Sequence, residues 1–229
     1  MAAPKAGTRD KLLDVAEQVF ASAGYDGASL RTITNKARVT VGSINYHFQS
    51  KEQLFEEVLR RRFETLAADR LARLGVARAD AKDGQPTVEA VVEALALPFL
   101  ERCMKGGKGW RNYSLILARH MYSRHWYERL FAELYDPGAK QFLAALKSCF
   151  PEATDEDVGY AWHFLLGAMV HCCADLETRR IDRLTEGICT AANYEAILPR
   201  FILFASAGIT AIAGGFGQLQ GDAGGAKPG

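Results

Sequence analysis

The sequence predicts an all-α fold on three observations. Apolar residues recur at spacings of three and four along the long segments, and the period-two alternation typical of strands is almost absent. Residues that cap helix N-termini, and glycines that end helices, stand at the segment boundaries. Hydrophobic residues make up 48% and charged residues 24% of the 229 residues, which is enough apolar material for a sizeable core.

The first third of the chain predicts four helices. Gly24 is a plausible left-handed cap at the end of the first. Ser29 and Thr40 cap two very short helices, and Ser50 forms a capping box with Gln53 at the start of a long one. Such short helices are marginal alone, so they must pack on their neighbours. The expected ranges are 8–24, 30–36, 41–47 and 51–74.

The remainder predicts a second all-α region after a polar linker over residues 79–86. Within it, Asp136 as a cap and Pro137 at the first helical position predict a helix start. The last two helices are the longest and most apolar. The expected ranges are 87–104, 110–121, 124–135, 137–149, 155–180 and 194–213.

Charge is distributed unevenly along the chain. Lys and Arg total 28 against 27 Asp and Glu, a formal net charge of +1 that shows no overall bias toward nucleic acid. Residues 1–75, however, carry 12 basic and 9 acidic side chains, and residues 27–51 contain no acidic residue at all. A polyanion meets no carboxylate on that stretch.

Two short helices joined by a three-residue turn are typical of a helix-turn-helix, whose second helix enters the major groove of DNA. If Thr40 caps that helix, Val41, Gly42 and Ser43 face the base edges, and Asn45 follows a turn later. The remaining candidates lie near phosphates: Ser29, Thr40, Tyr46, His47 and Lys51. Taken singly, Tyr46, His47 and Phe48 are better explained as core aromatic residues, and Lys51 as a solvated charge.

The segment from Thr8 to Leu59 resembles the N-terminal domain of the TetR family of bacterial transcriptional repressors. The strongest part is VTVGSINYHFQSKEQLF, residues 39–55, which matches in register. The resemblance implies a DNA-binding domain over 8–54 and a ligand-binding and dimerisation domain over 55–213. The small, Gly- and Ala-rich composition of residues 1–7 and 214–229 predicts disordered tails. The resemblance also implies that Phe48 and Leu54 anchor the second short helix to the next one. The residues it places on the operator are Ser29, Arg31, Thr40, Gly42, Ser43, Asn45, Tyr46, His47 and Lys51.

Arg38 departs from the family pattern, because it stands where the family commonly has Gly in the turn. A non-glycine residue at positive φ costs about 1 kcal/mol. Either the turn is adjusted, or Arg38 also contacts a phosphate.

The C-terminal region resembles the family's ligand-binding and dimerisation domain, most closely the branch that responds to fatty acids or their coenzyme A thioesters. The resemblance implies a homodimer in which the last two long helices form a four-helix bundle with their symmetry mates, on a palindromic double-stranded operator. The apolar stripes of these helices predict the dimer residues: Trp162, Leu165, Leu166, Met169, Leu198, Phe201, Ile202, Ala205 and Ile209.

A hydrophobic small-molecule effector is expected to bind between the middle helices. The candidates are Trp110, Tyr113, Leu117, Phe131, Phe142 and Phe164, with His120 or Arg119 for a polar head group. Ordinary core packing explains each of these residues about as well. No cofactor and no metal are expected.

Two other classes of function stay open. An enzyme using His163, His171 and the nearby cysteines is one, although no nucleophile and base pattern is legible. A helical interaction module that does not bind DNA is the other. The five cysteines have no metal-ligand spacing and predict free thiols in the cytoplasm. The apolar run over 201–216 is expected to be too short for a membrane span.

Overall fold

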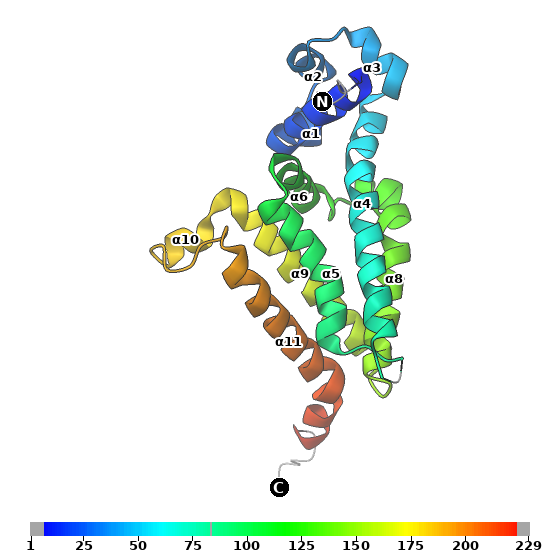
Figure 1. The fold of residues 1–229 in the computed structure, drawn as a ribbon, viewed down its shortest axis with the longest axis vertical. Coiled ribbons are helices and arrows are strands. Elements are labelled where there is room, and N and C mark those ends of the chain that lie inside the picture. Colours follow the sequence, from blue (N-terminus) through cyan, green and yellow to red (C-terminus); the bar gives the residue numbers. More distant parts are fainter. Residues whose placement is uncertain (1–6, 83, 224–229) are drawn as a thin grey trace.

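The computed structural model describes residues 7–82 and 84–223, and within these ranges it contains helices and no strand. Figure 1 shows α1, α2 and α3 at one end of the molecule, with α4 running from that end along the body. The predicted all-α fold is therefore confirmed. These first helices are α1 (Thr8–Gly27), α2 (Leu30–Ala37), α3 (Val41–Phe48) and α4 (Lys51–Ala79).

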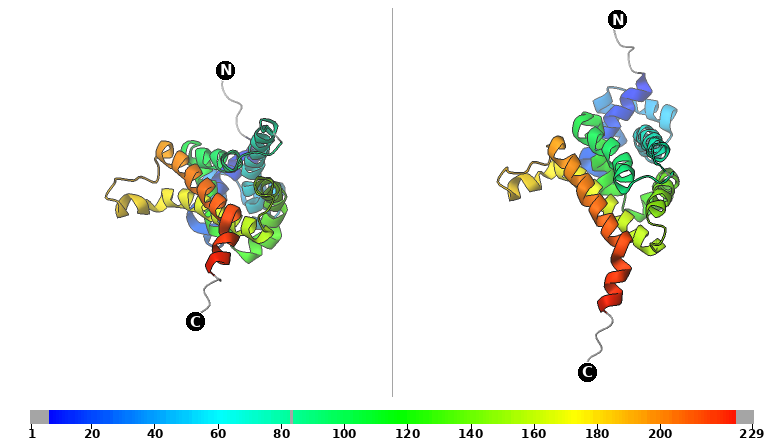
Figure 2. Two further views of the ribbon diagram at one scale, coloured as in Figure 1. Left: turned by 90° about the horizontal axis from the view of Figure 1, so that it is seen from below. Right: turned by 60° about the horizontal axis from the view of Figure 1, so that its bottom comes forward.

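The body is built around α5, which packs against α4, α6, α8, α9 and α11. Most of its side chains are buried, and its charged residues Glu89, Glu93, Glu101 and Lys105 are exposed. Its segments are α5 (Val88–Lys105), α6 (Lys108–His120), α7 (Arg124–Trp126), the π-helix η1 (Tyr127–Phe131), α8 (Ala132–Cys149), α9 (Asp155–Thr178), α10 (Arg180–Leu184) and α11 (Tyr194–Ala223). Figure 2 shows α10 standing out from the body.

The predicted helix start at Asp136 and Pro137 is wrong. Pro137 lies inside α8, which begins at Ala132. The irregularity falls one turn earlier, where the N–H of Ala132 donates to the carbonyl of Tyr127 in a π-helical turn. A proline has no N–H, so it fits the first turn of a helix or a distorted interior, and sequence alone does not separate the two.

Several helix boundaries also differ from those expected. Gly24 has the predicted positive φ of 70°, but with ψ 176° it kinks α1, and the helix resumes as far as Gly27. Both α4 and α11 run past their expected ends at 74 and 213, and α10 was not expected. Residues 214–223, expected to be a disordered tail, continue α11, whereas 1–6 and 224–229 lie outside the described residues.

Candidate nucleic-acid interface and ligand cavity

The short helices α2 and α3 are held by a buried core and by caps. Ile33, Ile44 and Phe48 are fully buried between them, α1 and α4. Ser29 accepts the N–H of Thr32 at 3.0 Å, which confirms the predicted cap of α2. These contacts fix α3 from behind and leave its outer face free of packing.

The caps around α3 differ in detail from the expectation. Ser50 accepts the N–H of Gln53 at 3.1 Å as predicted. Thr40 has the extended backbone of an N-cap, but its hydroxyl pairs with that of Ser43 at 3.2 Å and caps no backbone N–H. The hydroxyls of Thr40 and Ser43 therefore lie side by side at the N-terminus of α3.

The turn between α2 and α3 keeps the left-handed conformation that glycine favours. Arg38 has φ 53° and ψ 49°, and its N–H donates to the carbonyl of Asn35 at 3.1 Å. The N–H of Val39 donates to Thr34 at 3.1 Å. The turn is thus not adjusted to accommodate Arg38, and the exposed arginine side chain is retained despite the backbone cost.

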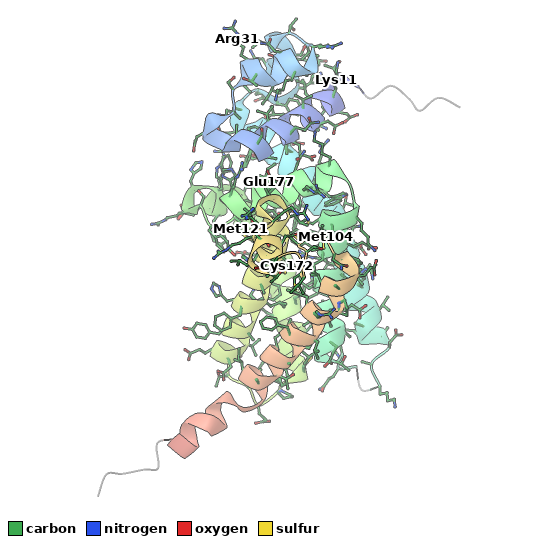
Figure 3. The ribbon with its side chains drawn as sticks, turned by 90° about the vertical axis from the view of Figure 1, so that its left-hand side faces the viewer. Lys11, Arg31, Met104, Met121, Cys172 and Glu177 are labelled. Carbon is green, nitrogen blue, oxygen red and sulfur yellow. The ribbon has the colours of Figure 1, made fainter. Side chains whose placement is uncertain are left out.

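The outer face of α3 is exposed and lacks acidic side chains. Tyr46 is 83% exposed and Val41 50%, values that are unusual for large apolar side chains. Among the described residues, Arg31 and Arg38 form no ion pair, and Lys51 lies 4.4 Å from the ring of Tyr25. Figure 3 places Arg31 at the tip of this end of the molecule. The exposed candidates are Ser29, Arg31, Arg38, Thr40, Val41, Gly42, Asn45 and Tyr46, and the partly exposed ones are Ser43, His47 and Lys51.

Gly42 is not required by anything within the protomer. A Cβ added there would meet only the Thr40 hydroxyl, at an ordinary 3.8 Å. The backbone of α3 at this position therefore lies open to close approach by a partner from outside.

A cavity of about 510 Å³ lies in the body between α4, α5, α6, α8 and α9, within the size range of small-molecule sites. Of the residues predicted to bind ligand, Leu117, Phe131 and Phe142 line it. Trp162, Leu166 and Met169, expected in the dimer interface, line it as well. The other lining residues are Phe63, Leu66, Ala67, Arg70, Leu71, Leu95, Phe99, Met121, Tyr122, Arg124, Tyr127, Tyr135, Asp136, Gly138, Ala139, His163 and Val170.

Four predicted ligand residues lie elsewhere. Tyr113 is fully buried and its hydroxyl is 2.5 Å from that of Tyr135, so it stands behind the cavity wall. Phe164 points outward and is 58% exposed. Trp110 and His120 lie where α6 meets the first helices. Aromatic residues at helical spacing do not reveal which of them faces a cavity.

Arg70 is the lining residue that sequence reasoning missed. It is 9% exposed, and its Nε donates to the carbonyl of Leu95 at 2.8 Å. Its position is legible in retrospect, because Phe63, Leu66, Arg70 and Leu74 share one face of α4 at spacings of three and four, and a charge interrupts that apolar stripe.

The end of α6 joins the cavity to the first helices. Leu117 lines the cavity, and one turn later the Nε2 atom of His120 accepts the backbone N–H of Tyr25 at 3.3 Å. Arg119 donates to the carbonyl of Ala21. Burial lowers the pKa of His120, in keeping with an imidazole that must be neutral to accept this bond.

A buried charge cluster reinforces the same junction. The carboxylate of Glu17 on α1 accepts from Arg61 and Arg62 of α4, each at 2.9 Å. The guanidinium groups of Arg62 and Arg102 both lie 5.2 Å from the Trp110 ring. Trp110 therefore packs between α4 and α5 rather than against a ligand.

The predicted dimer residues mostly face inward. Leu165, Phe201, Ala205 and Ile209 are buried within the protomer, while Leu198 and Ile202 are half-buried. The apolar side chains exposed on α9 and α11 are instead Tyr160, Phe164, Leu203 and Phe204, at 54–71%. By length and composition alone, Tyr194–Gly215 is a candidate membrane span of 22 residues, a test that the core helix of a soluble protein also passes.

The cysteines and histidines of the described body form no group of three that could hold a metal. Burial raises the pKa of the thiols of Cys149, Cys172 and Cys173, which disfavours reactive thiolates. His163 and His171 are exposed and line two different pockets. Within the described part of the chain, neither histidine forms a hydrogen bond to a cysteine or a hydroxyl group that would pair a nucleophile with a base.

An exposed, acid-free helix-turn-helix attached to a helical body with an internal cavity defines a DNA-binding regulator. Residues 12–58 match the family described as bacterial regulatory proteins, tetR family, and residues 93–208 match the tetracyclin repressor-like C-terminal domain. The second match alone covers just over half of the chain. The chain belongs to the TetR family of helix-turn-helix transcriptional regulators, which are not enzymes.

Curated relatives match only part of the chain. The transcriptional repressor KstR2 of Mycolicibacterium smegmatis is 46% identical over 55 residues, 24% of this chain and 27% of that protein. KstR2 of Rhodococcus jostii is 34% identical over 88 residues, 38% of this chain and 41% of that one. The chain thus spans less than half the length of these relatives.

Solved structures extend the likeness in fold over almost the whole chain. The ketosteroid transcriptional regulator KstR2 of Mycobacterium tuberculosis has a TM-score of 0.60 at 20% identity, covering 88% of this chain and 96% of that one. FadR of Bacillus subtilis, solved with stearoyl-CoA, has a TM-score of 0.56 at 14% identity, covering 87% and 98%.

Proposed function

We propose that this protein is a homodimeric transcriptional repressor that binds a palindromic operator in the cytoplasm through α3 and releases it when a hydrophobic effector fills the cavity. The observation that carries the proposal is the outer face of α3. It exposes Tyr46 and Val41, offers Ser43 and Asn45 as hydrogen-bonding groups, and contains no carboxylate.

A band-shift titration with DNA from upstream of the protein's own gene tests operator binding. We expect a sequence-specific complex at moderate salt, and a loss of affinity of at least tenfold in Tyr46→Ala and Lys51→Ala. Arg180→Ala is the matched control, because Arg180 is an exposed base on α10, far from α3. Absence of a specific complex, or equal affinity in all four proteins, would refute the proposal in favour of an interaction module.

The exposed apolar faces of α9 and α11 favour binding to a second copy of the chain. Phe164 and Phe204 are 58% and 68% exposed, and such a patch is unfavourable in a monomer. Two copies joined there would present two α3 helices, so that each reads one half of a palindrome.

The route from effector to operator is proposed to run through α6. A ligand in the cavity contacts Leu117, and the same helix contacts α1 through Arg119 and His120. A displacement of α6 would therefore move α1 to α3 as a unit. An effector that binds the displaced form better lowers operator affinity, since it changes the populations of the two forms.

A further inference from the structure

Arg70 is a buried cation that faces an apolar cavity without an anionic partner. Among the described residues it forms no ion pair, whereas Arg73 and Arg102 both bind Asp69 beside it, at 3.0 and 2.7 Å. Its contacts are the Leu95 carbonyl, the sulfur of Met169 at 3.4 Å and the ring of Phe99 at 5.5 Å.

These contacts leave part of the guanidinium unused. An arginine has five N–H donors, and the structure gives hydrogen bonds only to Nε and Nη2. Within the described residues Nη1 forms no hydrogen bond. Arg70 lines the cavity, so this free donor is available to a ligand bound there.

The surrounding groups do not neutralise this charge. The ionisable groups that act electrostatically on Arg70 are Tyr113, Tyr135, Cys103 and Cys173. Burial raises the pKa of Tyr113, Tyr135 and Cys173, which keeps them uncharged at neutral pH. Asp136, the one carboxylate among the lining residues, accepts the hydroxyl of the half-exposed Tyr127 at 3.0 Å instead.

An isolated buried charge is costly, and an apolar residue of similar volume would serve the fold better. The rest of the wall near Arg70 is hydrocarbon and aromatic, including Leu66, Phe99 and Phe131. The site therefore combines one buried cation with an apolar surface, since the other lining arginine, Arg124, is exposed and pairs with Glu128 at 2.8 Å. A buried cation on an apolar wall is the complement of an amphipathic monoanion.

We propose that the effector is a hydrophobic carboxylic acid, bound as the free carboxylate against Arg70 with its hydrocarbon along the apolar wall. The inference rests on the proposed function, which makes this cavity the effector site. It predicts that the free acid is preferred over its coenzyme A thioester, because the thioester carbonyl at the end of the hydrocarbon carries no charge to pair with Arg70.

Calorimetric binding to the DNA-free protein tests the proposal with matched probes. One set is dodecanoate, dodecan-1-ol and dodecanoyl-coenzyme A, and a second is a fused-ring carboxylate and its alcohol. We expect a carboxylate to bind at least tenfold more tightly than its matched alcohol, and dodecanoate more tightly than its thioester. The proposal is overturned if no carboxylate of either skeleton binds, or if the alcohols or the thioester bind as tightly.

The variant Arg70→Met tests whether Arg70 causes the preference for the carboxylate over the alcohol. We expect it to lose the tenfold preference for the acid while it keeps its affinity for the alcohol. Arg73→Met is the matched control, one turn along α4 and paired with Asp69 outside the cavity. A retained preference in Arg70→Met contradicts the proposal, and if that variant fails to fold, the comparison of probes on the wild-type protein still decides it.

Operator binding is measured in a separate assay. Failure of the proposed function can therefore be distinguished from failure of this inference. Carboxylates that bind through Arg70 but never release DNA would refute the proposed function alone. An alcohol or thioester that binds as tightly and does release DNA would refute only this inference.

Discussion

Gly42 has opposite expected effects on the stability of the protomer and on DNA binding. It occupies the second position of α3, where a methyl group would meet only ordinary van der Waals contact. Glycine is a poor helix former, so its presence is unfavourable for the isolated protomer. A glycine at this position is explained by the proposed close approach of DNA to α3.

Gly42→Ala is therefore expected to stabilise the protein and weaken its function. Alanine in a helix is favoured over glycine by about 1 kcal/mol, and the melting temperature should rise by a few degrees. Operator affinity, measured by fluorescence anisotropy, should fall at least tenfold because the new methyl group blocks close approach. Unchanged affinity would mean that α3 does not contact DNA at this residue.

Arg38, like Gly42, is unfavourable for the stability of the protomer and is a candidate for contact with DNA. Its φ of 53° is costly for a side chain, and the structure shows the arginine exposed beside α3. Arg38→Gly should raise the free energy of unfolding by about 1 kcal/mol, as measured by urea denaturation. If the side chain contacts a phosphate, the same variant should reduce the salt dependence of operator binding by about one charge. An unaltered salt dependence would argue against that contact.

At the scale of residues, the sequence could predict only features that depend on a few neighbouring residues in the chain. The caps at Ser29 and Ser50 were predictable, because the N-cap hydrogen bond is set within a few residues. The role of Arg70 was not, because the absence of a counter-charge depends on side chains brought together from four other helices.

At the scale of elements, α6 both lines the cavity and contacts α1. Its contact with α1 includes the bond from the Tyr25 N–H to His120, which needs an uncharged imidazole nitrogen. Burial lowers the pKa of His120, with Asp26 opposing and Arg119 adding to the shift. The junction is therefore expected to weaken in acid.

The sign of this pH dependence follows from the lowered pKa. The contribution of His120 to stability is complete above the ordinary imidazole pKa of about 6.5, and it is lost as the pH falls from there toward the lower folded-state value. His120→Gln keeps an acceptor but does not titrate. The drop in melting temperature between pH 7.5 and pH 5 should thus be smaller in His120→Gln than in the wild type. Equal drops would show that His120 does not contribute.

Helical periodicity could not predict how α9 and α11 are oriented. Both helices are apolar on more than one side, so the pattern predicted burial without saying which stripe faces the protomer and which a partner. As a result, residues predicted for the dimer, such as Leu165 and Ile209, lie in the protomer's own core.

For the whole molecule, the exposed faces of α9 and α11 predict the oligomeric state. Phe164→Glu and Phe204→Glu, singly or together, should convert the dimer to a monomer in analytical ultracentrifugation, because charge repels charge across a two-fold axis. Operator affinity should fall sharply, while circular dichroism stays helical. Leu184→Glu, on exposed α10, is the control and should remain dimeric. A monomeric wild type, or dimeric variants, would contradict the proposed interface.

The central claim is that two copies of α3 read DNA, and footprinting the full chain on the DNA upstream of its own gene tests this most directly. We predict protection of a palindrome whose half-sites lie about one helical turn apart or a multiple of it, present in Arg180→Ala and lost in Tyr46→Ala. Protection without two-fold symmetry, or a footprint that survives in Tyr46→Ala, would contradict the account.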